Sequence, residues 1–147
     1  MNAFQLEFYT RLRAWNNLRT DLIHLPLHEK CTEVDKFWQQ CPATAHYLHP
    51  VDIDSWPDPW QLLDDNMYCP YARALGMIYT LVMLGISDID LVDATDHNSI
   101  DVVLVLVDRA KYVLNYWPNT VVNNKLGDFT ITKKYNIIPI IQKTGTL

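Results

Sequence analysis

The stretch that decides the fold is Cys69-Pro70-Tyr71-Ala72-Arg73-Ala74-Leu75-Gly76-Met77-Ile78-Tyr79-Thr80-Leu81-Val82-Met83-Leu84-Gly85. Pro70 suits the first position of a helix, where a missing N–H has no intrahelical partner, and Gly85 suits the position just after the end. The side chains between them are apolar almost all round, with Arg73 and Thr80 as the main exceptions. A helix that is apolar on every side must be buried, so this one is predicted to be central.

The segments before this helix are predicted to be mainly helical. Apolar residues recur at three- and four-residue steps over residues 3–20, which indicates an amphipathic helix. Leu25-Pro26-Leu27 is predicted to end the first helix, and a second helix follows that ends at Pro42. Residues 43–61, rich in proline and aromatic residues, are predicted to be an ordered, packed loop.

The segments after the helix are predicted to form an antiparallel sheet. The β-branched run over residues 102–107 indicates a strand covered on both faces, and residues 112–117 return as its partner. Residues 129–132 alternate like a half-exposed strand, and residues 137–141 are predicted as an edge segment because Pro139 cannot donate to a ladder. The expected class is α+β, with the buried helix packed on the sheet.

Composition sets limits on function. The 147 residues suit a single domain, and 12 Lys and Arg against 17 Asp and Glu leave a net charge of −5 with a pI of about 5.4, so no nucleic-acid partner is expected. No membrane-spanning or secretory segment is visible. Three cysteines, an odd number, are interpreted as free thiols in a reducing compartment, which predicts a cytoplasmic protein.

Charge is distributed unevenly along the chain. Residues 52–108 contain eleven Asp against a single cation, Arg73. The run Asp88–Asp96 lacks the glycine and terminal glutamate of a calcium loop, so it is interpreted as a solvated acidic rim and no metal is expected. The tail carries lysines that could pair with this rim in a partner, in another copy or within the same domain: Lys125, Lys133, Lys134 and Lys143.

Cys69 is the sharpest candidate for chemistry. It occupies the N-cap position of the predicted central helix, where the helix dipole stabilises a thiolate. The alternative is that Cys69 is a small buried residue that caps a core helix. A cysteine nucleophile also needs a base within hydrogen-bond reach and a third group that orients the base.

Residues 54–117 resemble the bacterial transglutaminase-like cysteine proteinases, within the papain-like and transglutaminase-like fold. Five features carry the resemblance: Asp54-Ser55-Trp56-Pro57-Asp58-Pro59 with Leu63, Cys69 at the nucleophile position, the helix to Gly85, Asp101-Val102-Val103-Leu104 on the strand that begins with the family's histidine, and Tyr112-Val113-Leu114-Asn115-Tyr116 on the strand that carries its orienting aspartate. The single domain expected over residues 1–147 then has a helical N-terminal part, residues 1–50, this core, and a strand-rich tail, residues 118–147.

The departures from the family fall on its chemistry. Residues 66–71 lack the acidic pairs around the family's cysteine, Asp101 stands at the position of the base histidine, and Asn115 stands at that of the aspartate. His97 could supply the base if Asn98 to Ile100 form a loop that returns it to the site. The candidate catalytic residues are therefore Cys69, His97 and Asn115.

Two functions remain open. The preferred hypothesis is a catalytically degenerate domain, not an enzyme, that acts as a structural or interaction module with protein partners in a larger assembly, with a bacteriophage virion as the suggested one. The alternative is a cysteine peptidase, amidase or acyltransferase in which Cys69 attacks an amide carbonyl. Neither hypothesis requires a cofactor.

Overall fold

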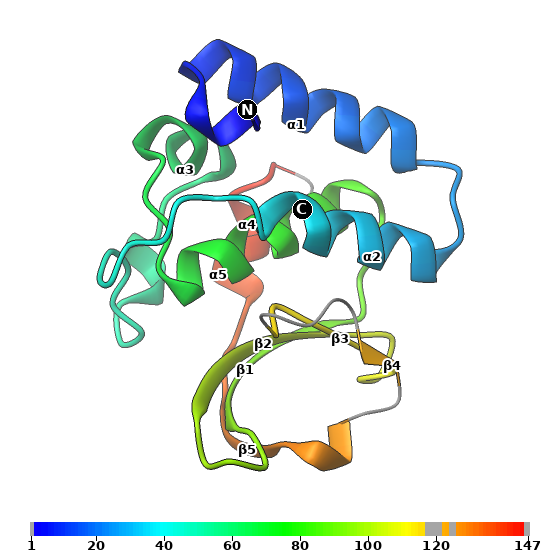
Figure 1. Cartoon of the computed structure of the whole chain (residues 1–147), viewed down its shortest axis with the longest axis vertical. Helices are drawn as coiled ribbons and strands as arrows, with labels where there is room; N and C mark the ends of the chain where they lie inside the picture. The colour runs from blue at the N-terminus through cyan, green and yellow to red at the C-terminus, as the bar shows by residue number, and fades with distance from the viewer. Residues whose placement is uncertain (1, 117–121, 124–125, 146–147) are drawn as a thin grey trace.

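The computed structural model describes residues 2–116, 122–123 and 126–145, and in that part the chain is an α+β fold with helices on one side of a five-stranded antiparallel sheet (Figure 1). The α-helices are α1 (Phe8–Leu22), α2 (Leu27–Trp38), α3 (Pro59–Asp65), α4 (Pro70–Met83) and α5 (Ile138–Gln142). Short 3₁₀ helices are η1 (Ala3–Gln5), η2 (Ile53–Ser55) and η3 (Leu126–Asp128). The strands are β1 (Ile89–Thr95), β2 (Asp101–Val107), β3 (Tyr112–Leu114), β4 (Val122–Asn123) and β5 (Thr130–Lys134), in the order β4-β3-β2-β1-β5. The predicted α+β class is confirmed.

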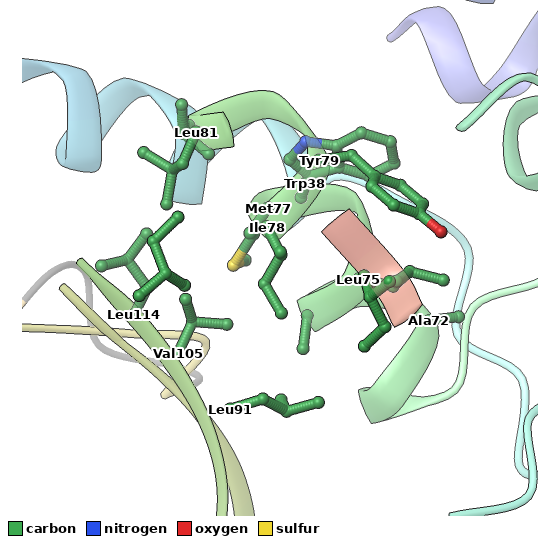
Figure 2. Packing of buried hydrophobic residues seen from close by; sticks show 14 of the residues in the cluster. Trp38, Ala72, Leu75, Met77, Ile78, Tyr79, Leu81, Leu91, Val105 and Leu114 are labelled. Atoms are coloured by element: carbon green, nitrogen blue, oxygen red, sulfur yellow. The ribbon is translucent and has the colours of Figure 1, made fainter. Parts of the chain in front are cut away.

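Helix α4 is the centre of the core, as its sequence predicts. Cys69 is its N-cap, Pro70 is its first residue, and Gly85 follows its end with a φ of 87°. Every residue from Ala74 to Leu81 is buried. Figure 2 shows why: side chains of α2 and of the sheet surround α4, with Trp38 from α2 and Leu91, Val105 and Leu114 from three strands.

Thr80, one of the two polar exceptions on α4, joins three helices. Its hydroxyl accepts hydrogen bonds from the indole N–H groups of Trp15 on α1, at 2.8 Å, and Trp38 on α2, at 3.0 Å. It donates in turn to the Gly76 carbonyl at 2.7 Å. All three polar groups are therefore buried at little cost, because each has a partner.

The N-terminal prediction of one helix over residues 3–20 is correct in type but not in its boundaries. The chain forms η1 first and then starts α1, because the Glu7 carboxylate accepts the N–H groups of Tyr9 and Thr10, at 3.1 and 2.9 Å, and so caps a new helix. In the predicted loop over residues 43–61, Trp56 is buried, whereas Trp60 is 42% exposed and already belongs to α3.

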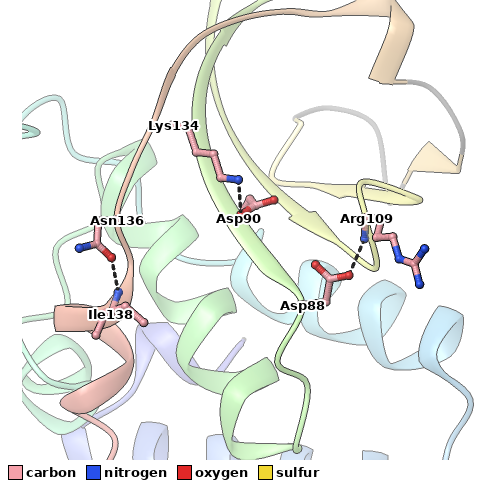
Figure 3. A network of polar contacts seen from close by, with 6 residues as sticks. All are labelled: Asp88, Asp90, Arg109, Lys134, Asn136 and Ile138. Carbon is pink, nitrogen blue, oxygen red and sulfur yellow. Dashed lines mark hydrogen bonds and ion pairs between the residues drawn. The ribbon is translucent and has the colours of Figure 1, made fainter.

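Strand β1 was not predicted, and it corrects the interpretation of residues 88–96 as a solvated rim. Four apolar residues of β1 are buried on one face of the sheet or the other, namely Ile89, Leu91, Val92 and Ala94, and β1 pairs with both β2 and β5. The aspartates between them hid this pattern. Figure 3 shows their partners: Asp90 forms an ion pair with Lys134 at 3.2 Å, and Asp88 accepts the backbone N–H of Arg109 at 2.9 Å. The acidic segment and the basic tail thus meet within the same domain.

The tail prediction is partly wrong. Residues 130–134 form strand β5, but the expected edge segment over residues 137–141 is mainly helix α5. Pro139 lies in the first turn of α5, where its missing N–H costs as little as it would on an edge strand, so local sequence does not distinguish the two. Ile140 is buried and α5 packs on α4. Trp117 and Lys125, which also entered the predictions, lie outside the described residues.

Across the described ranges, no helix combines the length and the apolar character needed to cross a membrane.

Gly76 generates a test of this packing. A Cβ atom at position 76 would lie 2.5 Å from the Trp38 ring, so Gly76→Ala must displace the indole that Thr80 holds. We expect the free energy of unfolding to fall by about 1–3 kcal/mol, as for other overpacked cores, although alanine is the better helix former. Urea unfolding of wild type and variant measures this change in the free energy of unfolding. Gly127→Ala, where a Cβ meets nothing within 4 Å, is the control, and equal stability of the two variants would contradict this packing.

Candidate functional site

Cys69 lies at the start of α4 but is almost completely covered. Its side chain is 3% exposed and makes no capping hydrogen bond to the helix. The residue before it is held by the chain near residue 43: Ala43 pairs with Tyr68, and the Thr44 N–H donates to the Tyr68 carbonyl at 2.9 Å. The predicted N-cap position is therefore confirmed, in a setting with little access for a substrate.

The other two cysteines are free thiols as well, as expected. Burial raises the pKa of Cys31 to about 12, and the charges of Asp108 and Asp35 add to the effect. Burial likewise raises the pKa of Cys41 to about 12, against an opposing influence of Arg73. Both thiols are therefore protonated at neutral pH and poorly reactive.

Asn115 joins the sheet to the start of α4. The residue follows β3, adopts the left-handed conformation with a φ of 69° and is buried. Its side-chain amide donates to the carbonyl of Val103 on β2, at 2.9 Å, and to that of Pro70 on α4, at 3.2 Å. Its Oδ1 atom accepts the Nε–H of Arg73 at 2.5 Å. Every hydrogen of the amide group is thus used, and its oxygen is occupied by an arginine.

A buried carboxylate supports this arrangement from α2. Asp35, 1% exposed, accepts the backbone N–H of Asn115 at 2.8 Å through Oδ1. Its Oδ2 atom has no hydrogen-bond partner among the described residues. Burial raises the pKa of Asp35, and the Asn115 N–H, Gln39 and the charge of Arg73 oppose the rise. The carboxyl group is therefore more easily protonated here than in the unfolded chain.

His97 lies in the turn between β1 and β2. The residues after it do form a loop, because the Asp96 carboxylate accepts the N–H groups of Asn98 and Ile100, at 2.8 and 3.0 Å. The His97 side chain, however, is exposed, and its ring lies 3.3 Å from the Asn98 amide nitrogen. Within the described part of the chain, no hydrogen bond joins the His97 ring to Cys69 or to Asn115.

A cavity of about 580 Å³ lies in front of the start of α4. Arg73 and Asn115 line it, and so do Asp93 of β1 and Asp101 of β2, whereas Cys69 and His97 do not. Asp93 and Val103 are opposite each other in the register of β1 and β2, and Asp101 lies two residues before Val103 on the same face. The structure thus brings together Asn115 and Asp101, two of the residues singled out in the sequence.

Three further residues of this region were missed by the sequence reasoning. The Asp93 carboxylate accepts the phenol O–H groups of Tyr71, at 2.7 Å, and of Tyr135, at 2.6 Å. Burial raises the pKa of Tyr71 to about 12, and burial followed by the hydrogen bond to Asp93 raises that of Tyr135. Both phenols therefore remain donors at neutral pH.

Arg73 was noticed in the sequence only as a polar exception. Burying a single cation on an otherwise apolar helix costs free energy unless the cation has a partner. The sequence therefore offered one indication that Arg73 binds a specific polar group. Its partner, Asn115, lies 42 residues away in the chain. Within the described residues, no group of three or more His, Cys, Asp or Glu side chains is arranged to hold a metal ion.

The chain matches no protein-family model and no curated protein sequence. It is similar in structure to LapG of Legionella pneumophila. Calcium-bound LapG superimposes with a TM-score of 0.73 at 16% identity, over 89% of this chain and 77% of that chain. LapG itself and its EGTA-treated form both give 0.70 at 17% identity over 88% of this chain, and 76% and 74% of theirs. At such identities the likeness establishes the fold alone, and it confirms the transglutaminase-like fold that the sequence resembles.

The raised pKa of Asp35 predicts how stability changes with pH. The folded state binds the Asp35 proton more tightly than the unfolded chain, so stability decreases as pH rises from the unfolded carboxyl pKa, about 3.9, through the higher folded value. Asp35→Asn removes this loss, and we expect the variant to gain stability relative to the wild type as pH rises through that range. Urea unfolding between about pH 3 and pH 8 measures the difference.

Asp64→Asn is the matched control, because Asp64 is an exposed carboxylate. It should track the wild type across the same range. A stability difference between wild type and Asp35→Asn that moved in the opposite direction with pH would show that Asp35 is stabilised as a carboxylate.

Proposed function

We propose that this chain is a transglutaminase-like domain without cysteine-hydrolase activity that serves as a structural or interaction module in a larger protein assembly. The observation that carries the proposal is the hydrogen bond from the Arg73 Nε–H to Asn115 Oδ1. In a Cys–His–Asn site, this oxygen accepts the N–H of the base imidazole and orients it. Here a guanidinium occupies that oxygen.

Arginine cannot act in place of the histidine. A guanidinium stays protonated throughout the physiological range, has no acceptor atom and so cannot remove a proton from a thiol. Asp101, at the position that the resemblance gives to the base, brings a negative charge, which disfavours a thiolate nearby. The burial of Cys69 supports the same conclusion, since a nucleophile must reach the carbonyl that it attacks.

The proposed role in an assembly rests on the fold and on the cavity beside α4, which could bind a partner. A fold can carry binding as readily as chemistry, and this one retains a cavity of about 580 Å³ where a catalytic site would open. The proposed partners are proteins, and the proposed assembly is a bacteriophage virion.

One observation favours the alternative of a cysteine peptidase, amidase or acyltransferase. Cys69 lies at the N-terminus of α4, 14 residues long, where aligned peptide dipoles favour a thiolate. That alternative requires His97 to leave the β1–β2 turn and to displace Arg73 from Asn115. The two functions therefore differ in whether His97 controls the Cys69 thiol.

The test is the pH dependence of Cys69 alkylation by iodoacetamide, read at each cysteine by peptide mass spectrometry, in wild type and in His97→Ala. We expect Cys69 to react at least about tenfold more slowly than in urea-unfolded chain, because the thiol must first be exposed by local opening. The rate should be the same in both proteins. His46→Ala, which removes another exposed histidine, is the control. A thiolate that titrates well below about 8.5 and is lost in His97→Ala alone would overturn the proposal.

A further inference from the structure

Arg73 presents an unused edge to the cavity. Its Nε atom is fixed by Asn115, but its Nη1 and Nη2 atoms have no acceptor within the described part of the chain. A guanidinium held in this way offers two parallel N–H groups, which match the two oxygens of a carboxylate. The bond to Asn115 also sets the orientation of the fork in advance, which lowers the entropy cost of binding.

The charge of Arg73 is only partly balanced from within the protein. Asp35 attracts it electrostatically from α2 but makes no hydrogen bond to it, and burial raises the pKa of Asp35. Asp93 also lines the cavity, but it already accepts two phenol O–H groups. Room therefore remains on Arg73 for an anion from outside.

Asp101 supplies the opposite charge at the same cavity. It is exposed, and its carboxylate makes no hydrogen bond or ion pair with any described residue. Along β2 it lies two residues, or about 7 Å, from Val103, whose carbonyl binds the amide that holds Arg73. A ligand that satisfies both residues must carry both a negative and a positive charge.

We infer that this cavity binds an α-carboxylate that carries a basic side chain, as in a C-terminal lysine or free lysine, with the carboxylate on Arg73 and the ammonium on Asp101. Lysine carries a carboxylate and an ammonium at the two ends of a flexible four-carbon stem, which is the pair of charges that these two lining residues would bind. A cavity of about 580 Å³ lies within the range of sites for small ligands and accommodates the end of a peptide. The inference rests on the proposed function and names the partner chemistry of that site.

Ligands with one kind of charge fit less well. A phosphate would meet the carboxylates of Asp93 and Asp101, and a polyamine would leave the Arg73 fork unpaired. A peptide that ends in an amide removes the negative charge from Arg73, and norleucine in place of lysine removes the positive charge from Asp101 while it keeps the apolar stem.

The experiment is isothermal titration of the whole chain with acetyl-Ala-Ala-Lys, its C-terminal amide, acetyl-Ala-Ala-norleucine and free lysine. We expect the amide to bind about tenfold more weakly or worse, because a hydrogen-bonded charge is lost, and the norleucine peptide roughly three- to fivefold more weakly, as for an exposed ion pair. Free lysine that binds as well as the peptide identifies a small-molecule site, and preference for the peptide identifies a chain end.

Two variants test whether Asp101 binds the ammonium of the ligand and Arg73 its carboxylate. Asp101→Asn should bind the lysine and norleucine peptides equally, whereas Asp64→Asn should retain the difference. Arg73→Gln should bind the free acid and the amide equally, and its melting temperature is measured beside it, because Arg73 also holds Asn115. If Arg73→Gln does not fold, the amide and Asp101→Asn comparisons still decide the result.

Failure of the inference and failure of the proposed function give different signals. If Cys69 is unreactive and the protein binds the free acid and the amide equally, or binds neither, the inference alone is overturned. Cleavage of the peptide, or an acyl adduct on Cys69 seen by mass spectrometry after incubation, would overturn the proposed function as well.

Discussion

The side chain of Asn115 is the interaction on which this arrangement depends. One amide group binds the carbonyls of Val103 and Pro70 and the guanidinium of Arg73, so it joins β2 to the first turn of α4. The backbone N–H of the same residue binds Asp35 on α2. Removal of the buried Asn115 side chain would leave the carbonyls of Val103 and Pro70 and the Nε–H of Arg73 without these partners, although the backbone bond to Asp35 would remain, so the cost of losing this amide is high.

These same bonds decide what the site can do. The Asn115 oxygen that would orient an imidazole is occupied by Arg73, and the thiol of Cys69 is covered rather than exposed to the cavity. What faces the cavity instead is a fixed cation beside two carboxylates, Asp93 and Asp101. We therefore propose that this site serves recognition, since among the described residues no hydrogen bond connects the Cys69 thiol to a base.

The elements predicted correctly from sequence are those whose signals are local. Helix α4 has a proline at its start, a glycine after its end and an apolar surface between them, and β2 after Asp101 is a continuous apolar run rich in valine. The failures occur where the deciding contact is distant in the sequence. The aspartates of β1 suggest a solvated rim from sequence alone because their partners, such as Lys134, lie far along the chain. Pro139 suits an edge strand and a first helical turn alike, and contact with α4 selected the helix.

The sequence by itself determined that the chain is α+β, that a buried helix begins after Cys69, and that the expected base position holds Asp101. Tertiary structure alone decided that Arg73 meets Asn115, that Asp35 is buried beneath them, and that His97 faces solvent. The reason is physical. Such hydrogen bonds join residues tens of positions apart, and they form only when strand register and the left-handed backbone of Asn115 bring donor and acceptor within reach, which no local periodicity encodes.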